Sequence, residues 1–146
     1  MNPNIIKITE SSKYFIDLIN LELLLWPEHD FDELYEETKV NKDFYFGYLL
    51  DDKLVGFTQV SIRYDYVNGS TTSPVGFLEG IYVVEGYRNQ GIGKALLDYS
   101  SQFLKEKGCK ELGSDALIDN TISHKFHEKM GFKEVERVVC YIRKLE

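Results

Sequence analysis

The part of the sequence that most constrains the fold is a glycine-rich turn between an apolar run and an amphipathic segment. The run FLEGIYVV ends at Val84, and the turn with the segment behind it reads GYRNQGIGKALL, from Gly86 to Leu97. This order predicts a strand, a tight turn and a helix. The first N–H groups of a helix lack partners and lie at the positive end of its dipole, so such turns commonly bind phosphate. We therefore expect a phosphate-containing ligand at this turn.

Two common phosphate loops do not fit the turn. The dinucleotide fingerprint G-x-G-x-x-G starts correctly at Gly91 and Gly93 but meets Leu96 where a third glycine is required. The P-loop requires a lysine where Ile92 stands, and a serine or threonine where Ala95 follows Gly93-Lys94. What remains to be explained is the hexapeptide RNQGIG.

The rest of the chain alternates helical and strand patterns without an internal repeat or a linker. The predicted elements are, in order, helices over 11–25 and 31–38, a hairpin over 43–63 around the turn DDK, a strand over 74–84, a helix from 92 to about 108, a short strand over 109–114, a helix over 120–130 and a final strand over 133–145. With 146 residues, of which 43% are hydrophobic, the chain predicts one α/β domain, residues 1–146, with a mixed central sheet flanked by helices.

The amino-acid composition indicates which classes of binding partner and which cellular compartment to expect. The 24 acidic and 17 basic residues give a formal charge of −7, which argues against nucleic acid and agrees with a cationic partner as well as with simple solubility. Neither a leader segment nor an apolar run long enough to span a bilayer is recognised, so we expect a cytoplasmic protein without membrane contact. Cys109 and Cys140 are not in a paired ligand spacing. We expect both to be buried apolar residues, and we expect neither a disulfide nor a bound metal.

Two motifs resemble those of the GNAT superfamily of N-acetyltransferases. RNQGIG is similar to its R/Q-x-x-G-x-G/A signature, and NTISHKFHEKMGF is similar to its later N-x-x-A-x-x-x-Y-x-K-x-G-F segment; together they cover about residues 77–133. The resemblance implies the GNAT acyl-CoA N-acyltransferase fold, with acetyl-CoA as co-substrate and its pyrophosphate held by the amides of the turn. The alternative, an ordinary tight connection between a strand and a helix, stays open. The cofactor contacts that the resemblance implies are Ile81, Tyr82, Val83, Arg88, Asn89, Gln90, Gly91, Ile92, Gly93, Lys94 and Asn120.

The later motif departs from the family pattern at two positions. Ser123 stands where the family has a small alanine, which is a mild change. His127 stands where the family has a tyrosine thought to protonate the departing CoA thiolate. An imidazole can do the same near neutral pH, so His127 is a candidate general acid. A helix-surface histidine without a role is the alternative.

Glu79 is the candidate residue for binding and deprotonating the amine that accepts the acetyl group. A primary amine is mostly protonated at neutral pH and must lose a proton before its nitrogen can attack a thioester. A carboxylate beside the cleft can bind the cation and accept that proton, and Glu79 lies in an otherwise apolar strand. Gly80 next to it predicts a bulge that opens the strand toward a ligand. The alternative is a glutamate that simply faces solvent.

A narrower resemblance covers almost the whole chain. SIRYDYVNGSTTSPVGFLEGIYV, SDALIDNTISH and ERVVCYIRK resemble the aminoglycoside 6'-N-acetyltransferases, in particular a branch of short, dimeric resistance enzymes. This implies transfer of an acetyl group to the 6'-amine of an aminoglycoside antibiotic. The substrate residues that it implies are Trp26, Tyr66, Glu79, Asp115 and Glu136. Apart from Glu79, each of these residues also has an interpretation without a role in binding. Trp26 could be a core residue, Tyr66 could pack within its loop, Asp115 could stabilise a turn or cap a helix, and Glu136 could face outward from a strand.

Other functions remain open at this point. The acidic balance would equally suit a GNAT enzyme that acts on a polyamine or a protein amine, and a CoA-binding sensor without turnover is a third possibility, which Glu79 disfavours. Sizeable side chains alternate on both faces of RVVCYIRK, and a terminal strand can add to the sheet edge of a second subunit. Together with the resemblance, this pattern predicts a homodimer in which Glu136 reaches the neighbouring substrate pocket.

Overall fold

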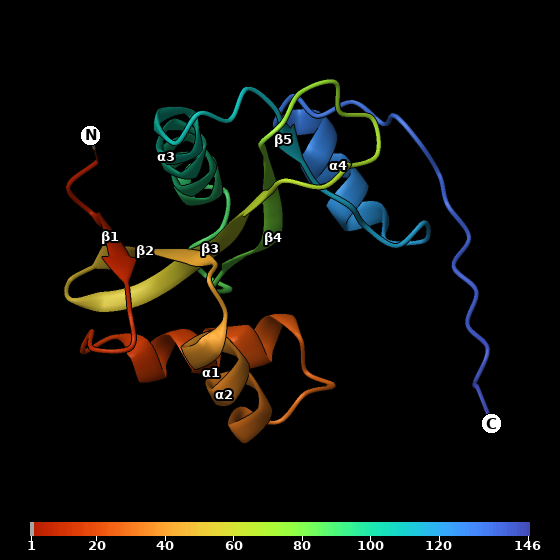
Figure 1. The fold of residues 1–146 in the computed structure, drawn as a ribbon. Coiled ribbons are helices and arrows are strands. Elements are labelled where there is room, and N and C mark those ends of the chain that lie inside the picture. The colour runs from red at the N-terminus through yellow and green to blue at the C-terminus, as the bar shows by residue number, and fades with distance from the viewer. Residues whose placement is uncertain (1) are drawn as a thin grey trace.

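The computed structural model describes residues 2–146, and Figure 1 shows their arrangement. The elements in chain order are β1 (Ile5–Ile8), α1 (Phe15–Leu25), α2 (Phe31–Val40), β2 (Phe44–Leu50), β3 (Lys53–Arg63), β4 (Val75–Val83), α3 (Ile92–Glu106), β5 (Leu112–Gly113) and α4 (Thr121–Lys129). The predicted α/β class with a mixed sheet between helices is confirmed.

The sheet has the strand order β1-β2-β3-β4-β5. Neighbours are antiparallel from β1 to β4, whereas β5 runs parallel to β4. The predicted hairpin is formed by β2 and β3, and its turn residues Asp51 and Asp52 have φ of 49° and 62°, as the tight turns of hairpins require. Strand β1 was not predicted from the sequence, because four residues are too few for a period-2 pattern to stand out.

Helices cover both faces of the sheet (Figure 1). On one face, α1 and α2 contribute Leu18, Ile19 and Leu34 to a cluster with Phe57. On the other face, α3 buries an apolar side that includes Leu96. Rings of α3 and β2 interlock there, with the centroids of Phe44 and Phe103 4.7 Å apart and those of Phe46 and Phe103 5.0 Å apart. The two apolar clusters hold the sheet rigidly between the helices.

Strand β4 carries a β-bulge at Glu79. Gln59 of β3 lies opposite Gly80 and Val60 lies opposite Leu78, so Glu79 is an extra residue without a partner on β3. The bulge expected from Gly80 is therefore present. Bulges re-aim side chains and are frequent beside active sites, and this one directs the only acidic side chain of the strand.

Strands β4 and β5 separate soon after they meet. Their pairing is confined to Gly76 with Leu112 and Phe77 with Gly113. Beyond Phe77, β4 continues through Glu79 to Val83, and beyond Gly113 the chain leaves the sheet toward α4. The backbone groups of β4 from Leu78 onward thus face a gap on the β5 side, which we call the β4–β5 gap.

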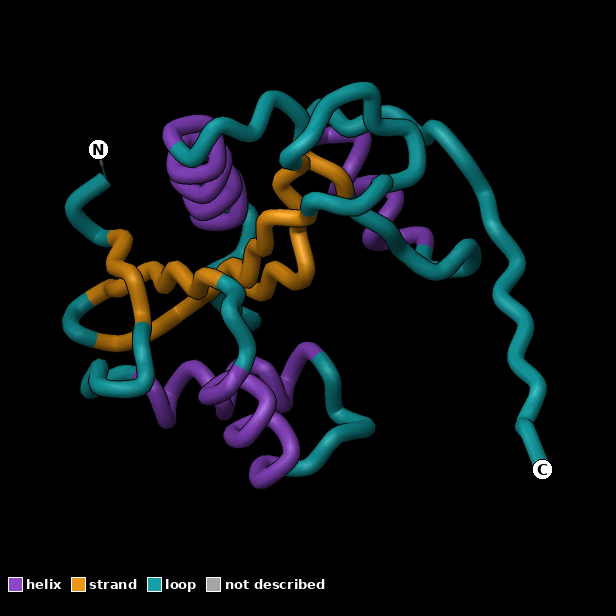
Figure 2. The backbone as a smooth tube through the Cα atoms, viewed as in Figure 1, coloured by secondary structure: helices purple, strands orange, loops and turns teal. Residues whose placement is uncertain are grey.

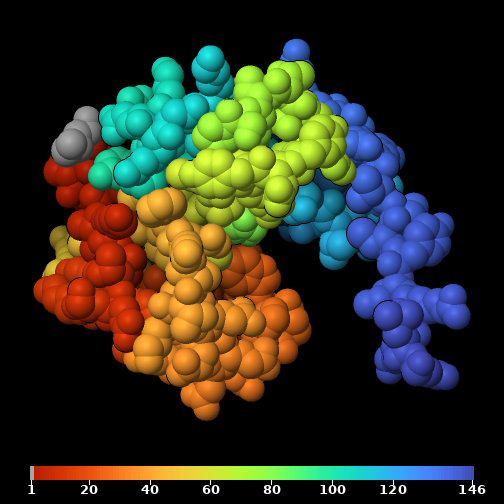
Figure 3. Space-filling model, in the orientation of Figure 1, coloured from red at the N-terminus to blue at the C-terminus, as the bar shows by residue number. Residues whose placement is uncertain are grey.

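The C-terminal segment, residues 133–146, does not form the predicted strand within the single chain. It is extended, exposed and unpaired, and Figures 1 and 2 show it running away from the domain as a loop. Figure 3 shows that it protrudes from the body of the molecule. The prediction was wrong for one chain because a strand pattern needs a neighbouring strand, and the sheet of this domain offers none there. Cys140 lies in this segment and is exposed, contrary to expectation, whereas Cys109 is buried as expected.

None of the helices within residues 2–146 is both long enough and apolar enough to cross a bilayer.

Candidate active site

The glycine turn positions unpaired amides at the start of α3. Gly91 is the N-cap residue with a φ of +82°, and no side chain caps the helix. Asn89 also has a left-handed φ of +61°. Arg88 fixes the turn to the end of β4, because its Nε donates to the carbonyl of Val83 at 2.7 Å and its guanidinium lies 5.3 Å from the ring centroid of Tyr82. The turn therefore presents N–H groups and a helix N-terminus close to the end of β4, as an anion site requires.

We expect Gly91→Val to weaken acetyl-CoA binding at least about 10-fold, which corresponds to about 1.4 kcal/mol. Apart from residues adjacent in the chain, no atom within residues 2–146 lies within 4 Å of the position that a Cβ of residue 91 would occupy, so we expect the new side chain to meet the ligand. Calorimetric titration of the folded variant with acetyl-CoA is the measurement. Gly108→Val is the matched control, because Gly108 has a φ of +96° with equally open surroundings but lies at the far end of α3. Equal affinities of the two variants would remove the turn from the cofactor site.

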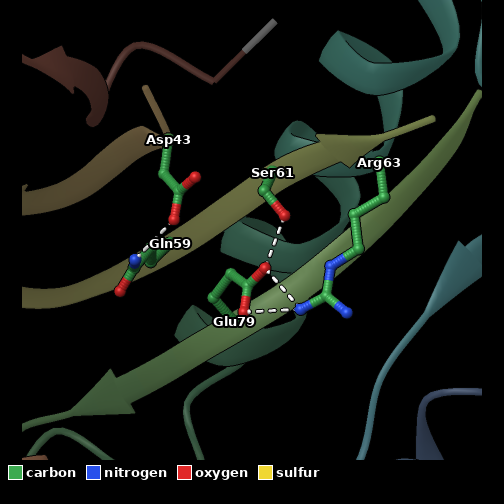
Figure 4. Close-up of polar contacts among 5 residues, drawn as sticks. All are labelled: Asp43, Gln59, Ser61, Arg63 and Glu79. Atoms are coloured by element: carbon green, nitrogen blue, oxygen red, sulfur yellow. Dashed lines mark hydrogen bonds and ion pairs between the residues drawn. The ribbon is translucent and has the colours of Figure 1, made fainter. Parts of the chain in front are cut away.

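Glu79 is held by two side chains of β3 (Figure 4). The Oγ of Ser61 donates to Oε2 of Glu79 at 2.5 Å, and Nη2 of Arg63 lies 2.9 Å and 3.1 Å from the two carboxylate oxygens. The guanidinium of Arg63 also stacks on Phe77, 3.5 Å from the ring centroid. The carboxylate is thus oriented in the absence of substrate, and one cationic partner already contacts it.

A second carboxylate lies near Glu79. Nε2 of Gln59 donates to Asp43 at 2.8 Å (Figure 4). Burial raises the pKa of Asp43, the Gln59 hydrogen bond opposes this, and the negative charge of Glu79 raises the pKa further. The two acids share one region of the sheet surface, which favours a cationic ligand.

Trp26 and Glu79 lie in the wall of one cavity of about 200 Å³. Trp26 ends α1 and packs directly on the bulge, since a methyl group at position 80 would lie 2.7 Å from Cη2 of Trp26. Only glycine fits there. The same cavity is lined by Glu22 and Glu37, and we call it the acidic cavity. Three carboxylates beside an indole suit a ligand that is both cationic and ring-shaped.

Glu22 was not identified from the sequence, although it is the most deeply buried acid of the cavity. Only 1% of the residue is exposed, and the hydroxyl of Thr38 donates to its carboxylate, at 3.0 Å and 2.9 Å from the two oxygens. Burial raises the pKa of Glu22 to about 7, and the Thr38 hydrogen bond opposes this. A helical spacing places Glu22 on the buried stripe of Phe15, Leu18 and Ile19, and this spacing was the available signal.

We expect Glu22→Gln to stabilise the protein above neutral pH and not below pH 4.5. Because the pKa of Glu22 is raised from 4.5 to about 7 on folding, the folded state binds more protons between these values. Stability therefore falls as pH rises through this window, by up to about 3 kcal/mol, and the amide removes that loss. Chemical denaturation at pH 4 and pH 8 measures it, with the exposed Glu36→Gln as control. The same pH dependence in wild type and Glu22→Gln would contradict the assignment.

The structure does not assemble the remaining substrate candidates around the acidic cavity. Tyr66 lies in the loop between β3 and β4, is 73% exposed, and accepts a hydrogen bond from the N–H of Gly69 at 3.1 Å. Asp115 is exposed just beyond β5. Glu136 is exposed in the C-terminal segment. Of the five predicted substrate residues, the single chain brings together Trp26 and Glu79.

The candidate contacts on α4 have defined structural partners. The Oδ1 of Asn120 caps the helix by accepting from the N–H of Ser123 at 3.1 Å. His127 is half-buried, with Nε2 2.6 Å from Oγ of Ser114 and Nδ1 2.7 Å from the carbonyl oxygen of Ser123. Ile81, Tyr82 and Val83 form the end of β4 beside the gap. Within residues 2–146, no group of three or more metal-binding side chains is found.

Comparison with known proteins agrees with this geometry. The chain matches the family model described as acetyltransferase (GNAT) family over residues 12–132. An aminoglycoside N(6')-acetyltransferase type 1 from Acinetobacter genomosp. 13 is 43% identical over 142 residues, which cover 94% of this chain and 96% of the relative.

Solved structures share the whole fold. The aminoglycoside antibiotic 6'-N-acetyltransferase AAC(6')-IG from Acinetobacter haemolyticus, in its apo form, has a TM-score of 0.91 at 35% identity, with both chains fully covered. AAC(6')-Iy in complex with the bisubstrate analogue CoA-S-monomethyl-acetylneamine has a TM-score of 0.87 at 36% identity, with 97% of each chain covered.

Proposed function

Since the chain belongs to the acetyltransferase (GNAT) family, we propose that it transfers the acetyl group of acetyl-CoA to the 6'-amino group of aminoglycoside antibiotics. The observation that carries this assignment is the 43% identity to an aminoglycoside N(6')-acetyltransferase over 94% of the chain. The acidic cavity supports it, because an aminoglycoside is a polycationic sugar. Acetylation removes a positive charge from the drug, which is the chemical basis of resistance.

Acetyl-CoA is the co-substrate. We place its pyrophosphate on the amides of the turn from Arg88 to Lys94, and its acyl-bearing arm in the β4–β5 gap along Ile81, Tyr82 and Val83. The unpaired backbone groups of β4 can hydrogen-bond that arm as a neighbouring strand would. We also assign a cofactor contact to Asn120, which caps α4.

Glu79 binds and orients the amine that is acetylated. A carboxylate and an ammonium at about 4 Å attract each other by about 4 kcal/mol at an effective dielectric constant near 20, before desolvation is subtracted. The bulge directs Glu79 toward the acidic cavity, and Trp26 offers an aromatic face for the sugar ring. Once the ammonium has lost a proton to the carboxylate, directly or through water, the neutral nitrogen attacks the thioester carbonyl.

The complete substrate site is formed by a homodimer. Glu136 lies in a segment whose apolar side chains are open to solvent, including Tyr141 at 91% and Ile142 at 98% exposure. A contiguous exposed apolar segment favours a partner surface, and the sizeable side chains on both faces of RVVCYIRK suit addition as a strand to a sheet. A second copy of the chain supplies that surface, so that Tyr66, Asp115 and the partner subunit's Glu136 complete the pocket begun by Trp26 and Glu79.

We place the enzyme in the cytoplasm. Its co-substrate is an intracellular metabolite, and both cysteines are free, as is usual in reducing compartments.

The test is release of the CoA thiol with kanamycin or tobramycin as the acceptor. We expect turnover with both, a product acetylated at the 6'-nitrogen by NMR, and no turnover with an aminoglycoside that carries a hydroxyl in place of the 6'-amine. Spermidine and a lysine peptide are the comparison acceptors. Higher kcat/KM with either of these would replace the proposal by the polyamine or protein-amine alternative, and acetyl-CoA binding without any turnover would replace it by a sensor.

A further inference from the structure

The hydrogen bonds of His127 occupy both of its ring nitrogens. The carbonyl oxygen of Ser123, 2.7 Å from Nδ1, can only accept, so Nδ1 carries a hydrogen. In the neutral ring Nε2 is then an acceptor, and the hydroxyl of Ser114, 2.6 Å away, donates to it. The rings of Phe126 and Phe132, with centroids 5.7 Å and 5.0 Å from that of His127, flank the imidazole. The ring is fixed in one orientation and one tautomer.

Ser114 stands at the mouth of the β4–β5 gap. The last paired residues are Phe77 and Gly113, so Ser114 is the first residue of the β5 side after the strands part, while Glu79 follows two positions beyond Phe77 on the β4 side. Ser114 is half-buried and belongs to no helix or strand. Ser114 therefore follows the last paired residue, where the gap in which the acyl-bearing arm is placed begins, and its Oγ lies 2.6 Å from Nε2 of His127.

We propose that Ser114 and His127 form a proton relay that protonates the departing CoA thiolate, with Ser114 in contact with the sulfur and His127 acting through Ser114. This assignment rests on the proposed acetyl transfer. His127 cannot donate to the sulfur from Nδ1, which is bound to Ser123, and Nε2 faces the serine. The geometry thus replaces the direct role expected for His127 by an indirect one.

The relay step balances in atoms and electrons. The amine nitrogen forms a bond to the acetyl carbon and releases its extra proton to solvent, the carbon–sulfur bond breaks, and its electron pair goes to sulfur. The sulfur takes the hydroxyl proton of Ser114, and Oγ of Ser114 takes the Nε2 proton of the imidazolium form of His127. The neutral imidazole left behind keeps its Nδ1–H bond to Ser123 and regains a proton from solvent.

The acetyl-transfer rate in a single turnover tests the relay. We expect Ser114→Ala to lower this rate at least about 10-fold with little change in the affinity for acetyl-CoA, because acid catalysis acts on the transition state. Ser114→Thr keeps the hydroxyl and restores most of the rate. A proton inventory in mixtures of H₂O and D₂O is curved for wild type, since two protons move together, and linear or flat for Ser114→Ala.

Two further variants separate a relay from a structural hydrogen bond. His127→Asn lowers the rate of wild type but has little additional effect in the Ser114→Ala background, because the two groups act in series. Ser100→Ala is the matched control: it removes a serine hydroxyl that is hydrogen-bonded to Thr58 at 2.7 Å in the core, so it lowers the melting temperature and leaves the transfer rate unchanged.

A wild-type rate for Ser114→Ala, or a full His127→Asn defect in the Ser114→Ala background, would overturn the relay. All variants are measured with an acceptor amine that wild type acetylates. If wild type acetylates another amine and no aminoglycoside, the proposed substrate is wrong and the relay is still tested with that amine.

Discussion

Glu79→Gln is expected to lower kcat/KM for kanamycin about 100-fold at neutral pH, the size of effect typical of a lost acid–base or charge-orienting group. The amide keeps the shape of the side chain and can still accept a hydrogen bond from Ser61. It loses the negative charge that binds the ammonium and the basic site that accepts its proton. Steady-state kinetics with an aminoglycoside and acetyl-CoA, each varied in turn, measure the loss.

Stability does not account for this expected loss. The ion pair of Glu79 with Arg63 is partly exposed, with side-chain exposures of 24% and 42%, so its removal costs at most about 1 kcal/mol. Glu106→Gln, at the exposed end of α3, is the control for an acid-to-amide change outside the site. Near-normal turnover of Glu79→Gln from mildly acidic to mildly alkaline pH would show that neither binding nor deprotonation of the amine depends on this carboxylate.

The local features of this fold were accessible from the sequence because each has a local cause. The turn at Gly91 requires a positive φ and an open surface, which only glycine provides without strain, and the structure has both. The bulge at Glu79 follows from Gly80, where the indole of Trp26 packs against the backbone. In each case a glycine stands at a position where the local backbone conformation or a close neighbour disfavours a side chain.

The features that were missed depend on tertiary context. The pairing of Arg63 with Glu79 depends on the strand register, which the bulge shifts by one residue. The raised pKa of Glu22 depends on burial between α1 and α2, where the hydroxyl of Thr38 is hydrogen-bonded to the carboxylate. The partner of His127, Ser114, lies 13 positions away and is brought close only by the path of the chain from β5 to α4.

The C-terminal segment differs from these features, because its sequence strongly predicts a strand that the single chain does not form. Residues 133–146 contain a run of strand-favouring apolar residues from Val138 to Ile142 but form no strand, because a strand is stabilised by the backbone and side-chain pairing of a neighbour. The apolar side chains Val138, Val139, Tyr141 and Ile142 are between 61% and 98% exposed. Both the strand-favouring sequence and the exposed position agree with our proposal that the segment forms a strand on contact with a second copy.

Deletion of the residues after Val135 is therefore expected to convert a dimer into a monomer and to abolish aminoglycoside turnover. Light scattering at micromolar concentration should give about twice 17.0 kDa for the full chain and about half of the dimer mass for the truncated one. The truncation keeps Val135, whose side chain lies directly over Gly69 in the loop that carries Tyr66. The domain keeps its helices and sheet, because the deleted residues are exposed.

Two companion measurements identify what the deletion removes. Glu136→Gln in the full chain keeps the apolar strand, so it should remain dimeric and raise KM for the aminoglycoside while leaving acetyl-CoA binding unchanged. The truncated chain should still bind acetyl-CoA, because the turn at Gly91 and the end of β4 lie within the remaining domain. A truncated monomer that acetylates kanamycin at the full rate would refute a shared substrate site and leave the acetyltransferase chemistry of Glu79 intact. A truncated dimer would instead place the interface on the body of the domain.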